Sequence, residues 1–151
     1  FCLMAENKIP TTNLYEDNQF KAVLEINPAN PGHILLFTKQ HFSDTTKLNQ
    51  ETTKELFNIA NNLAKALQKP TNIYVSNGKE AGQRFDHATI HIIPRQENDK
   101  VNFVWQPQKV EQEELEKIKQ EIVSNLPQKI EVIPEEPSDD ITPVSPETRI
   151  P

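Results

Sequence analysis

The chain of 151 residues is poor in the residues that define several protein classes: it has three glycines, one cysteine and one tryptophan, and no long apolar run. A membrane-spanning helix needs about 18 or more consecutive apolar residues, so the sequence predicts none. A single cysteine excludes an internal disulfide framework and favours a reducing compartment, so we expect a cytoplasmic protein.

Basic residues are also in the minority, with 16 lysines and arginines against 22 acidic residues and a net charge of −6. This balance lacks the basic footprint of nonspecific nucleic-acid binding, so no nucleic acid is expected as a partner. Residues 127–151 hold six acidic residues, two basic residues, six of the 12 prolines and no aromatic residue. Such a segment cannot bury enough apolar surface to order itself. We therefore expect a globular domain over residues 1–126 and an acidic, proline-rich tail over 127–151.

Periodicity predicts the main elements of the domain. Residues 20–26 and 33–38 have strand character and are joined by Asn-Pro-Ala-Asn-Pro-Gly, which is turn chemistry. Residues 48–68 predict a long helix with a broad apolar stripe and Asn49 as its N-cap. Further expected elements are strands over 72–76 and 85–93, an edge strand over 102–105, and a second helix over 111–126 with Leu115, Ile118 and Ile122 facing inward. The pattern predicts an α+β fold, an antiparallel sheet with the long helix packed on it.

The segment 76–95, SNGKEAGQRFDHATIHIIPR, carries most of the chemistry. Alternation along the predicted strand places His87, Thr89 and His91 on one face, and Pro94 ends the pairing. His87 and His91 lie four residues apart, roughly 13 Å along a strand, so they cannot both bind one metal ion. They can instead line one cleft with Thr89 between them.

An ordered set of motifs across residues 1–95 resembles the histidine triad (HIT) family of nucleotide hydrolases and transferases. The family signature reads His-x-His-x-His, and Thr89 stands at the middle position, which belongs to the nucleophile. The other matching segments are Lys8-Ile9-Pro10, Tyr15-Glu16-Asp17, Asn27-Pro28, Pro31-Gly32-His33 and Thr38-Lys39-Gln40-His41. The resemblance implies a HIT-like fold, a purine nucleotide or nucleoside phosphate as ligand, and a homodimer that pairs through the long helix and an adjoining strand.

The resemblance also implies roles for individual residues, grouped by the part of the nucleotide that they contact. The residues implied are Phe1, Val23 and Ile26 at the base, Glu25 at the ribose, Ser76, Gly82, Gln83 and His91 at the phosphate, and His33 behind the nucleophile. For several residues of this segment and the strands, a purely structural or solvent-exposed role remains an alternative to contact with the nucleotide. Val23 and Ile26 could be core residues, Glu25 could be a solvated strand charge, and Gly78 and Gly82 could serve an ordinary turn. Arg84, where part of the family has a small hydroxyl residue, could contact phosphate or point to solvent.

A zinc site is a further expectation, because some HIT relatives bind zinc through a Cys-x-x-Cys pair and two histidines. Cys2, His41 and His87 match three of those ligands, and the fourth would fall two places before Phe1. Three ligands are too few for a closed tetrahedral site. The alternative is a free cysteine beside two hydrogen-bonded histidines.

Function depends on Thr89 in this interpretation. The family mechanism uses an imidazole to attack the α-phosphorus, and a threonine hydroxyl is a weak nucleophile unless a base activates it. Thr89, His87, His91 and His33 are the candidate catalytic residues. Either the chain is a phosphoramidate or nucleotide hydrolase whose catalysis is impaired by Thr89, or it only binds nucleotides. From a different class, an interaction protein that acts through its acidic tail is the alternative.

Overall fold

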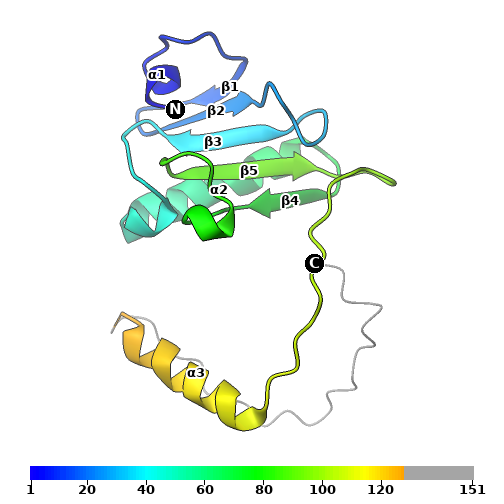
Figure 1. Ribbon diagram of the computed structural model, residues 1–151. Helices are drawn as coiled ribbons and strands as arrows, with labels where there is room; N and C mark the ends of the chain where they lie inside the picture. The colour runs from blue at the N-terminus through cyan, green and yellow to red at the C-terminus, as the bar shows by residue number, and fades with distance from the viewer. Residues whose placement is uncertain (128–151) are drawn as a thin grey trace. The chain divides into compact units, whose positions relative to one another are not determined.

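The computed structural model describes residues 1–127, and the chain divides after Val101 into two units that are described separately. The first unit contains a five-stranded antiparallel sheet in the order β1-β2-β3-β5-β4 (Figure 1). Its strands are β1 (Asn13–Glu16), β2 (Phe20–Leu24), β3 (Ile34–Thr38), β4 (Thr71–Tyr74) and β5 (Thr89–Pro94). The expected α+β architecture is confirmed.

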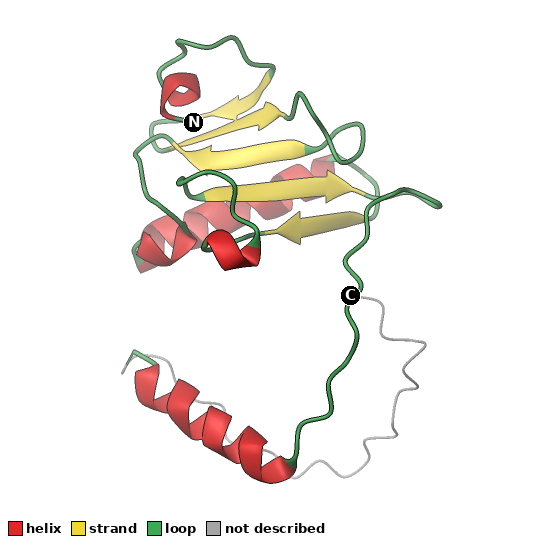
Figure 2. Cartoon of the chain, viewed as in Figure 1, coloured by secondary structure: helices red, strands yellow, loops and turns green. Residues whose placement is uncertain are grey.

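Helix α2 (Gln50–Ala66) covers one face of this sheet (Figure 2). It begins at Asn49, as expected, because the Asn49 side chain accepts a hydrogen bond of 2.8 Å from the Thr52 amide. Buried residues from the helix and from alternate strand positions form the main core, namely Phe20, Ala22, Ile34, Leu36, Leu56, Ile59, Ala60, Ile90 and Ile92. This face of the sheet is therefore given over to packing, and polar chemistry is left to the other face.

A short helix, α1 (Cys2–Ala5), packs on the opposite face of the sheet. A second, smaller cluster lies there, made of Ala5, Val23, Leu35 and Phe37, with Phe1 and Met4 against it. Neither α1 nor β1 was predicted. One helical turn is too short to show a period, and the Asn-Leu-Tyr-Glu of β1 lies mostly exposed at a sheet edge.

The bounds of β2, β3 and β4 differ by one or two residues from the predicted 20–26, 33–38 and 72–76, and two further predicted strands differ more. The histidine strand begins at Thr89 rather than at Phe85, because residues 85–88 form a bend in which the His87 amide bonds the Phe85 carbonyl at 2.8 Å. The edge strand expected over residues 102–105 is wrong: the segment is irregular, and the Asn102 side chain accepts from the Val104 amide at 2.9 Å. Such a local turn competes with strand pairing.

The second unit contains helix α3 (Gln112–Asn125) among its described residues. Its existence is confirmed, but its expected inward residues are not buried: Leu115, Ile118 and Ile122 are 46%, 41% and 56% exposed. Periodicity identifies the apolar face of a helix, but it does not identify the element that would have to pack against that face to bury it.

The expected domain boundary after residue 126 falls inside the second unit and stays a prediction, since the tail from residue 128 lies outside the described residues. Over residues 1–127, no helix is both long and apolar enough to cross a membrane. The cytoplasmic location stays a prediction.

Candidate functional site

The candidate site lies on the sheet face opposite α2, where β5 presents Thr89 and His91. Register places Phe37 of β3 beside Thr89, and Leu35 of β3 beside His91. Tyr74 of β4 lies on the other side of His91. The histidines separate into two groups on this face: His33 contacts His91, whereas His41 and His87 gather around Cys2.

The first group is a hydrogen-bonded relay whose direction the backbone sets. The Ala29 amide lies 3.2 Å from His33 Nδ1, and an amide can only donate, so this nitrogen is an acceptor. Neutral His33 therefore carries its proton on Nε2 and donates it to His91 Nδ1 at 3.0 Å. Neutral His91 in turn carries its proton on Nε2, for which no hydrogen-bond partner is found within residues 1–127. The relay thus offers an N–H donor on the half-buried His91 ring.

Burial lowers the pKa of both histidines below its ordinary value. For His33 the neighbouring His91 lowers the pKa further, and for His91 the Arg84 guanidinium does the same. The Glu25 carboxylate opposes these effects at both rings. The relay is therefore neutral at neutral pH, as the hydrogen bond between the two rings requires.

The loop between β4 and β5 precedes the histidine strand and contains a short 3-10 turn, η2 (Lys79–Ala81). Gly78 and Gly82 flank it with φ of +93° and +87°, which side chains rarely adopt. The Gln83 side chain holds this loop: its oxygen accepts from the Gly78 amide at 2.7 Å, and its amide donates to the carbonyls of Ser43 and Phe85 at 2.6 and 2.8 Å. Gln83 thus has a structural task in the loop, and its contact with phosphate stays a prediction.

Tyr74 belongs to this site although it was not singled out in the sequence. Its hydroxyl accepts a 2.8 Å hydrogen bond from Ser76, and its ring lies 6.0 Å from the His91 ring, centre to centre. A Cβ at Gly82 would stand 3.8 Å from the same hydroxyl. Only the pairing of β4 with β5, which sets Tyr74 opposite His91, could have revealed it.

The residues expected around the base and ribose occupy different environments. Glu25 and Ile26 lie just beyond the end of β2, where Glu25 is half-buried and accepts from the Asn27 amide at 2.9 Å. Ile26 is 86% exposed, whereas Val23 is 2% exposed beneath the N-terminal segment. Val23 thus serves the second core cluster, one of the two alternatives. The nucleotide contacts of these residues stay predictions.

Thr89 faces the same side as His91, and its hydroxyl donates to the His87 carbonyl at 3.1 Å. The two candidate bases are engaged elsewhere. His87 Nε2 donates to the Thr38 carbonyl at 2.7 Å, and His91 Nδ1 accepts from His33. Among the described residues, no imidazole nitrogen is hydrogen-bonded to the Thr89 hydroxyl.

The second histidine group has the donor set of a metal site. The ligand atoms of Cys2, His41 and His87 all lie within 4.8 Å of one another, with Cys2 Sγ 3.8 Å from His41 Nδ1 and 4.0 Å from His87 Nδ1. A tetrahedral zinc ion would bring such atoms to roughly 3.3–3.7 Å. The three residues fit the metal after a small contraction.

An outer hydrogen bond orients the His87 ring. His87 gives its Nε2 proton to the Thr38 carbonyl, so Nδ1 presents a lone pair toward the thiol. Metal-binding histidines commonly use their second nitrogen in this way. The exposed Asp86 carboxylate lies 3.9 Å from His41 Nε2, which is beyond hydrogen-bond distance. Burial lowers the pKa of His87, which keeps the lone pair available at neutral pH.

Phe1 lies directly beside this group. Its ring stacks on the His87 ring at 5.2 Å with an angle of 26° between planes. It also meets Phe37 and Phe85 edge-on at 5.0 and 5.7 Å. The N-terminal segment therefore joins the site at two successive residues, Phe1 and Cys2.

The five-stranded sheet with one long helix, together with these histidine groups, can be compared with known proteins. The HIT domain model matches residues 6–98, so the chain belongs to the HIT domain family. It is 32% identical to adenosine 5'-monophosphoramidase HNT1 of Saccharomyces cerevisiae over 128 residues, covering 83% of this chain and 81% of the yeast protein.

Two solved structures extend the comparison. A HIT family member from Bacillus subtilis has a TM-score of 0.79 at 30% identity, covering 84% of this chain and 96% of that one. A zinc-bound histidine triad family protein from Mycobacterium smegmatis has a TM-score of 0.64 at 31% identity, covering 72% of this chain and 82% of that one.

The relay predicts a pH-dependent stability. Because the pKa values of His33 and His91 lie below the unfolded value of about 6.5, the unfolded chain binds more protons in acid. Their contribution to the free energy of unfolding is complete above about pH 6.5 and is lost as the pH falls below it, by at most about 1.4 kcal/mol per pH unit for each histidine.

Urea unfolding between pH 7.5 and 5.0, with a chelator present, measures this loss. Replacing both residues by Gln should flatten the profile, although His87 leaves a residual slope. A wild-type stability that does not change over this range would contradict the relay.

Proposed function

We propose that this chain binds a purine nucleotide on the β5 face, with the His91 Nε2 proton donated to a phosphate oxygen. The observation that carries the proposal is the relay from the Ala29 amide through His33, which leaves a neutral His91 with an N–H donor. A neutral donor suits an anionic group, and it stays in place at physiological pH because the pKa of the ring is lowered.

The remainder of the nucleotide would extend from His91 toward the end of β2. Glu25 lies close enough to raise the pKa of both relay histidines, so its carboxylate is in position to accept hydrogen bonds from ribose hydroxyls. The similarity to a yeast adenosine 5'-monophosphoramidase supports an adenosine ligand. Gly82 has a positive φ and no side chain, so the loop backbone at this position can approach a phosphate closely.

We further propose that catalysis is impaired, because Thr89 occupies the position at which the family mechanism needs a nucleophilic imidazole. The Thr89 hydroxyl donates its proton to a carbonyl, and both neighbouring histidines are bonded elsewhere. A hydroxyl without a base is a poor nucleophile at neutral pH. Positioning of the substrate and the His91 donor would support only slow turnover.

The Cys2, His41 and His87 group is proposed to hold a zinc ion with water or a further ligand completing its coordination. The hydrogen bond from His87 Nε2 to the Thr38 carbonyl supports this assignment. Similarity to a zinc-bound protein from Mycobacterium smegmatis supports it independently. Uptake of Co²⁺ with a thiolate absorption band, absent in Cys2→Ser, is the measurement for this site.

A homodimer is proposed through the β4 edge of the sheet. Ile73 pairs with Ile92, which is buried under α2, so Ile73 lies on the α2 side of the sheet edge and is 41% exposed. Phe57, also 41% exposed, is two residues after Glu55, so the two side chains point to nearly opposite flanks of α2, about 200° apart around the helix axis. Glu55 contacts Gln19 of the β1–β2 connection, so Phe57 lies on the flank toward β4. Edge strand and helix flank together offer an apolar surface.

The first prediction for the nucleotide proposal concerns affinity. Calorimetry should detect adenosine monophosphate binding in the micromolar to millimolar range, or about 4–8 kcal/mol. Glu25→Ala should weaken the nucleotide about 10-fold or more without changing the binding of inorganic phosphate, because a charged acceptor contributes about 1.5–3 kcal/mol. Glu51→Ala, an exposed carboxylate on the far side of α2, is the matched control. No heat and no thermal shift with millimolar nucleotide would rule the proposal out.

The second prediction concerns chemistry at residue 89. Wild-type protein should release little amine from adenosine 5'-phosphoramidate, and Thr89→His should release at least 10-fold more, because the strand directs residue 89 into the cleft. Loss of a nucleophile costs several powers of ten in rate, at about 1.36 kcal/mol for each. Thr89→Ala is the matched control and should be as slow as wild type. Robust wild-type turnover that survives Thr89→Ala would mean that another residue attacks.

The third prediction concerns assembly. Sedimentation at micromolar concentration should give about twice the chain mass of 17.3 kDa. Ile73→Lys should shift the protein to monomer, because it places a charge in the proposed interface. Leu14→Lys, at an equally exposed position on the opposite edge strand β1, should leave the dimer intact. A monomeric wild type, or equal effects of both variants, would refute this interface.

A further inference from the structure

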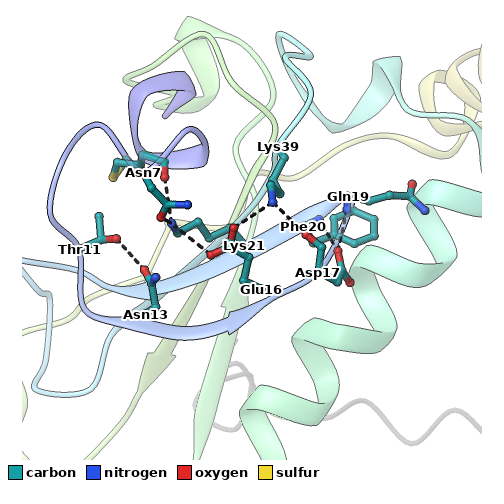
Figure 3. Close-up of polar contacts among 10 residues, drawn as sticks. Asn7, Thr11, Asn13, Glu16, Asp17, Gln19, Phe20, Lys21 and Lys39 are labelled. Atoms are coloured by element: carbon teal, nitrogen blue, oxygen red, sulfur yellow. Dashed lines mark hydrogen bonds and ion pairs between the residues drawn. The ribbon is translucent and has the colours of Figure 1, made fainter.

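A lysine is completely buried beneath the N-terminal segment. Lys21 of β2 has no exposed surface and lies in one cross-strand row with Phe37 and Thr89. Its ammonium contacts three acceptors, the Met4 carbonyl at 2.9 Å, the Asn7 side-chain oxygen, and Glu16 Oε2 at 3.5 Å (Figure 3). Three N–H groups meet three acceptors, which is the arrangement that a buried charge requires.

Two of these acceptors belong to the end of α1. Asn7 adopts a left-handed φ of +58°, its amide bonds the Met4 carbonyl at 3.1 Å, and the Lys8 amide bonds the Leu3 carbonyl at 2.8 Å. This pair of bonds is a Schellman motif, a common way for a helix to end. Lys21 therefore anchors the last turn of α1 through hydrogen bonds to the Met4 carbonyl and the Asn7 side chain.

Helix α1 needs an external anchor because it is only four residues long, and a single turn is not stable by itself. Its apolar contacts, through Phe1, Met4 and Ala5, are non-directional and permit sliding on the sheet. The Lys21 hydrogen bonds are directional. Any displacement of α1 would remove two of the three acceptors of this buried charge and leave only Glu16.

We propose that Lys21 is a positioning residue: by holding the end of α1, its ammonium sets where the Phe1 ring and the Cys2 sulfur stand against His87. The metal part of this inference rests on the proposed zinc site, whereas the Phe1 part does not. The polar contacts of Lys21 are to Met4, Asn7 and Glu16, which are neither proposed metal ligands nor proposed nucleotide contacts, so its effect passes through α1.

Lys39 offers a matched comparison. Its Nζ bonds the same Glu16 carboxylate at 2.9 Å, but its other contact is the Asp17 carbonyl at 3.1 Å, in the β1–β2 turn (Figure 3). Lys39→Met therefore removes the same charge and a bond to the same carboxylate without releasing α1. The Lys39 side chain is 29% exposed and that of Lys21 is buried, so the comparison controls for the charge and the Glu16 contact, and the ring contact reports on α1.

The experiment compares the full-length wild type, Lys21→Met and Lys39→Met by Co²⁺ titration and by the nuclear Overhauser contact between the Phe1 and His87 rings. Lys21→Met should bind Co²⁺ at least 10-fold more weakly and lose the ring contact. Lys39→Met should stay within twofold of wild type and keep it. A Lys21→Met protein that binds Co²⁺ like wild type and keeps the contact overturns the inference.

Two further outcomes are separable. If wild type takes up no Co²⁺, the zinc proposal fails, and the ring contact alone decides the role of Lys21: loss only in Lys21→Met supports it, and retention overturns it.

If Lys21→Met does not fold, Asn7→Gly replaces it, because glycine keeps the left-handed backbone and removes only the side chain that Lys21 holds. Asn7→Gly should then weaken Co²⁺ several-fold and reduce the ring contact, and unchanged values overturn the inference.

Discussion

The antiparallel pairing of β3 with β5 is the constraint on which the rest of this molecule depends. Its register sets Leu35 beside His91 and Phe37 beside Thr89, while Leu36 and Ile90 face α2. Because side chains alternate, a slip of one residue would turn His91 into the core and expose its apolar neighbours to water. Burial of one face under α2 thus determines, without any direct contact, which residues can form the site on the other face.

Backbone groups then give the two histidine groups opposite chemistry. An amide donor at Ala29 makes His33 Nδ1 an acceptor, and the relay ends in an N–H on His91, which suits an anion. A carbonyl acceptor at Thr38 takes the Nε2 proton of His87 and leaves a lone pair beside Cys2, which suits a metal ion. The side-chain types are the same, and the difference comes from whether the main chain donates or accepts behind each ring.

The separation of core and site also explains how threonine is compatible with this fold at position 89. Ile90 and Ile92 supply the buried contacts of β5, whereas Thr89 is half-buried on the other face and its hydroxyl is satisfied by the carbonyl of His87. A change there alters chemistry without opening a cavity under α2.

The net charge is also unevenly distributed along the chain. Residues 1–101 contain eleven basic and eleven acidic residues, so the net charge of −6 lies wholly in residues 102–151.

Local patterns were enough to predict the sheet-and-helix architecture, the Asn49 cap, and the sharing of one face by Thr89 and His91, because period and capping depend on residues close together in the chain. Tertiary structure alone decided that His33 bonds His91, that Tyr74 stands opposite it, that Lys21 holds α1, and that β5 begins at Thr89. Each of these features depends on contacts between segments that are far apart in the chain. The periodicity of one segment does not show which other segment will pack against it.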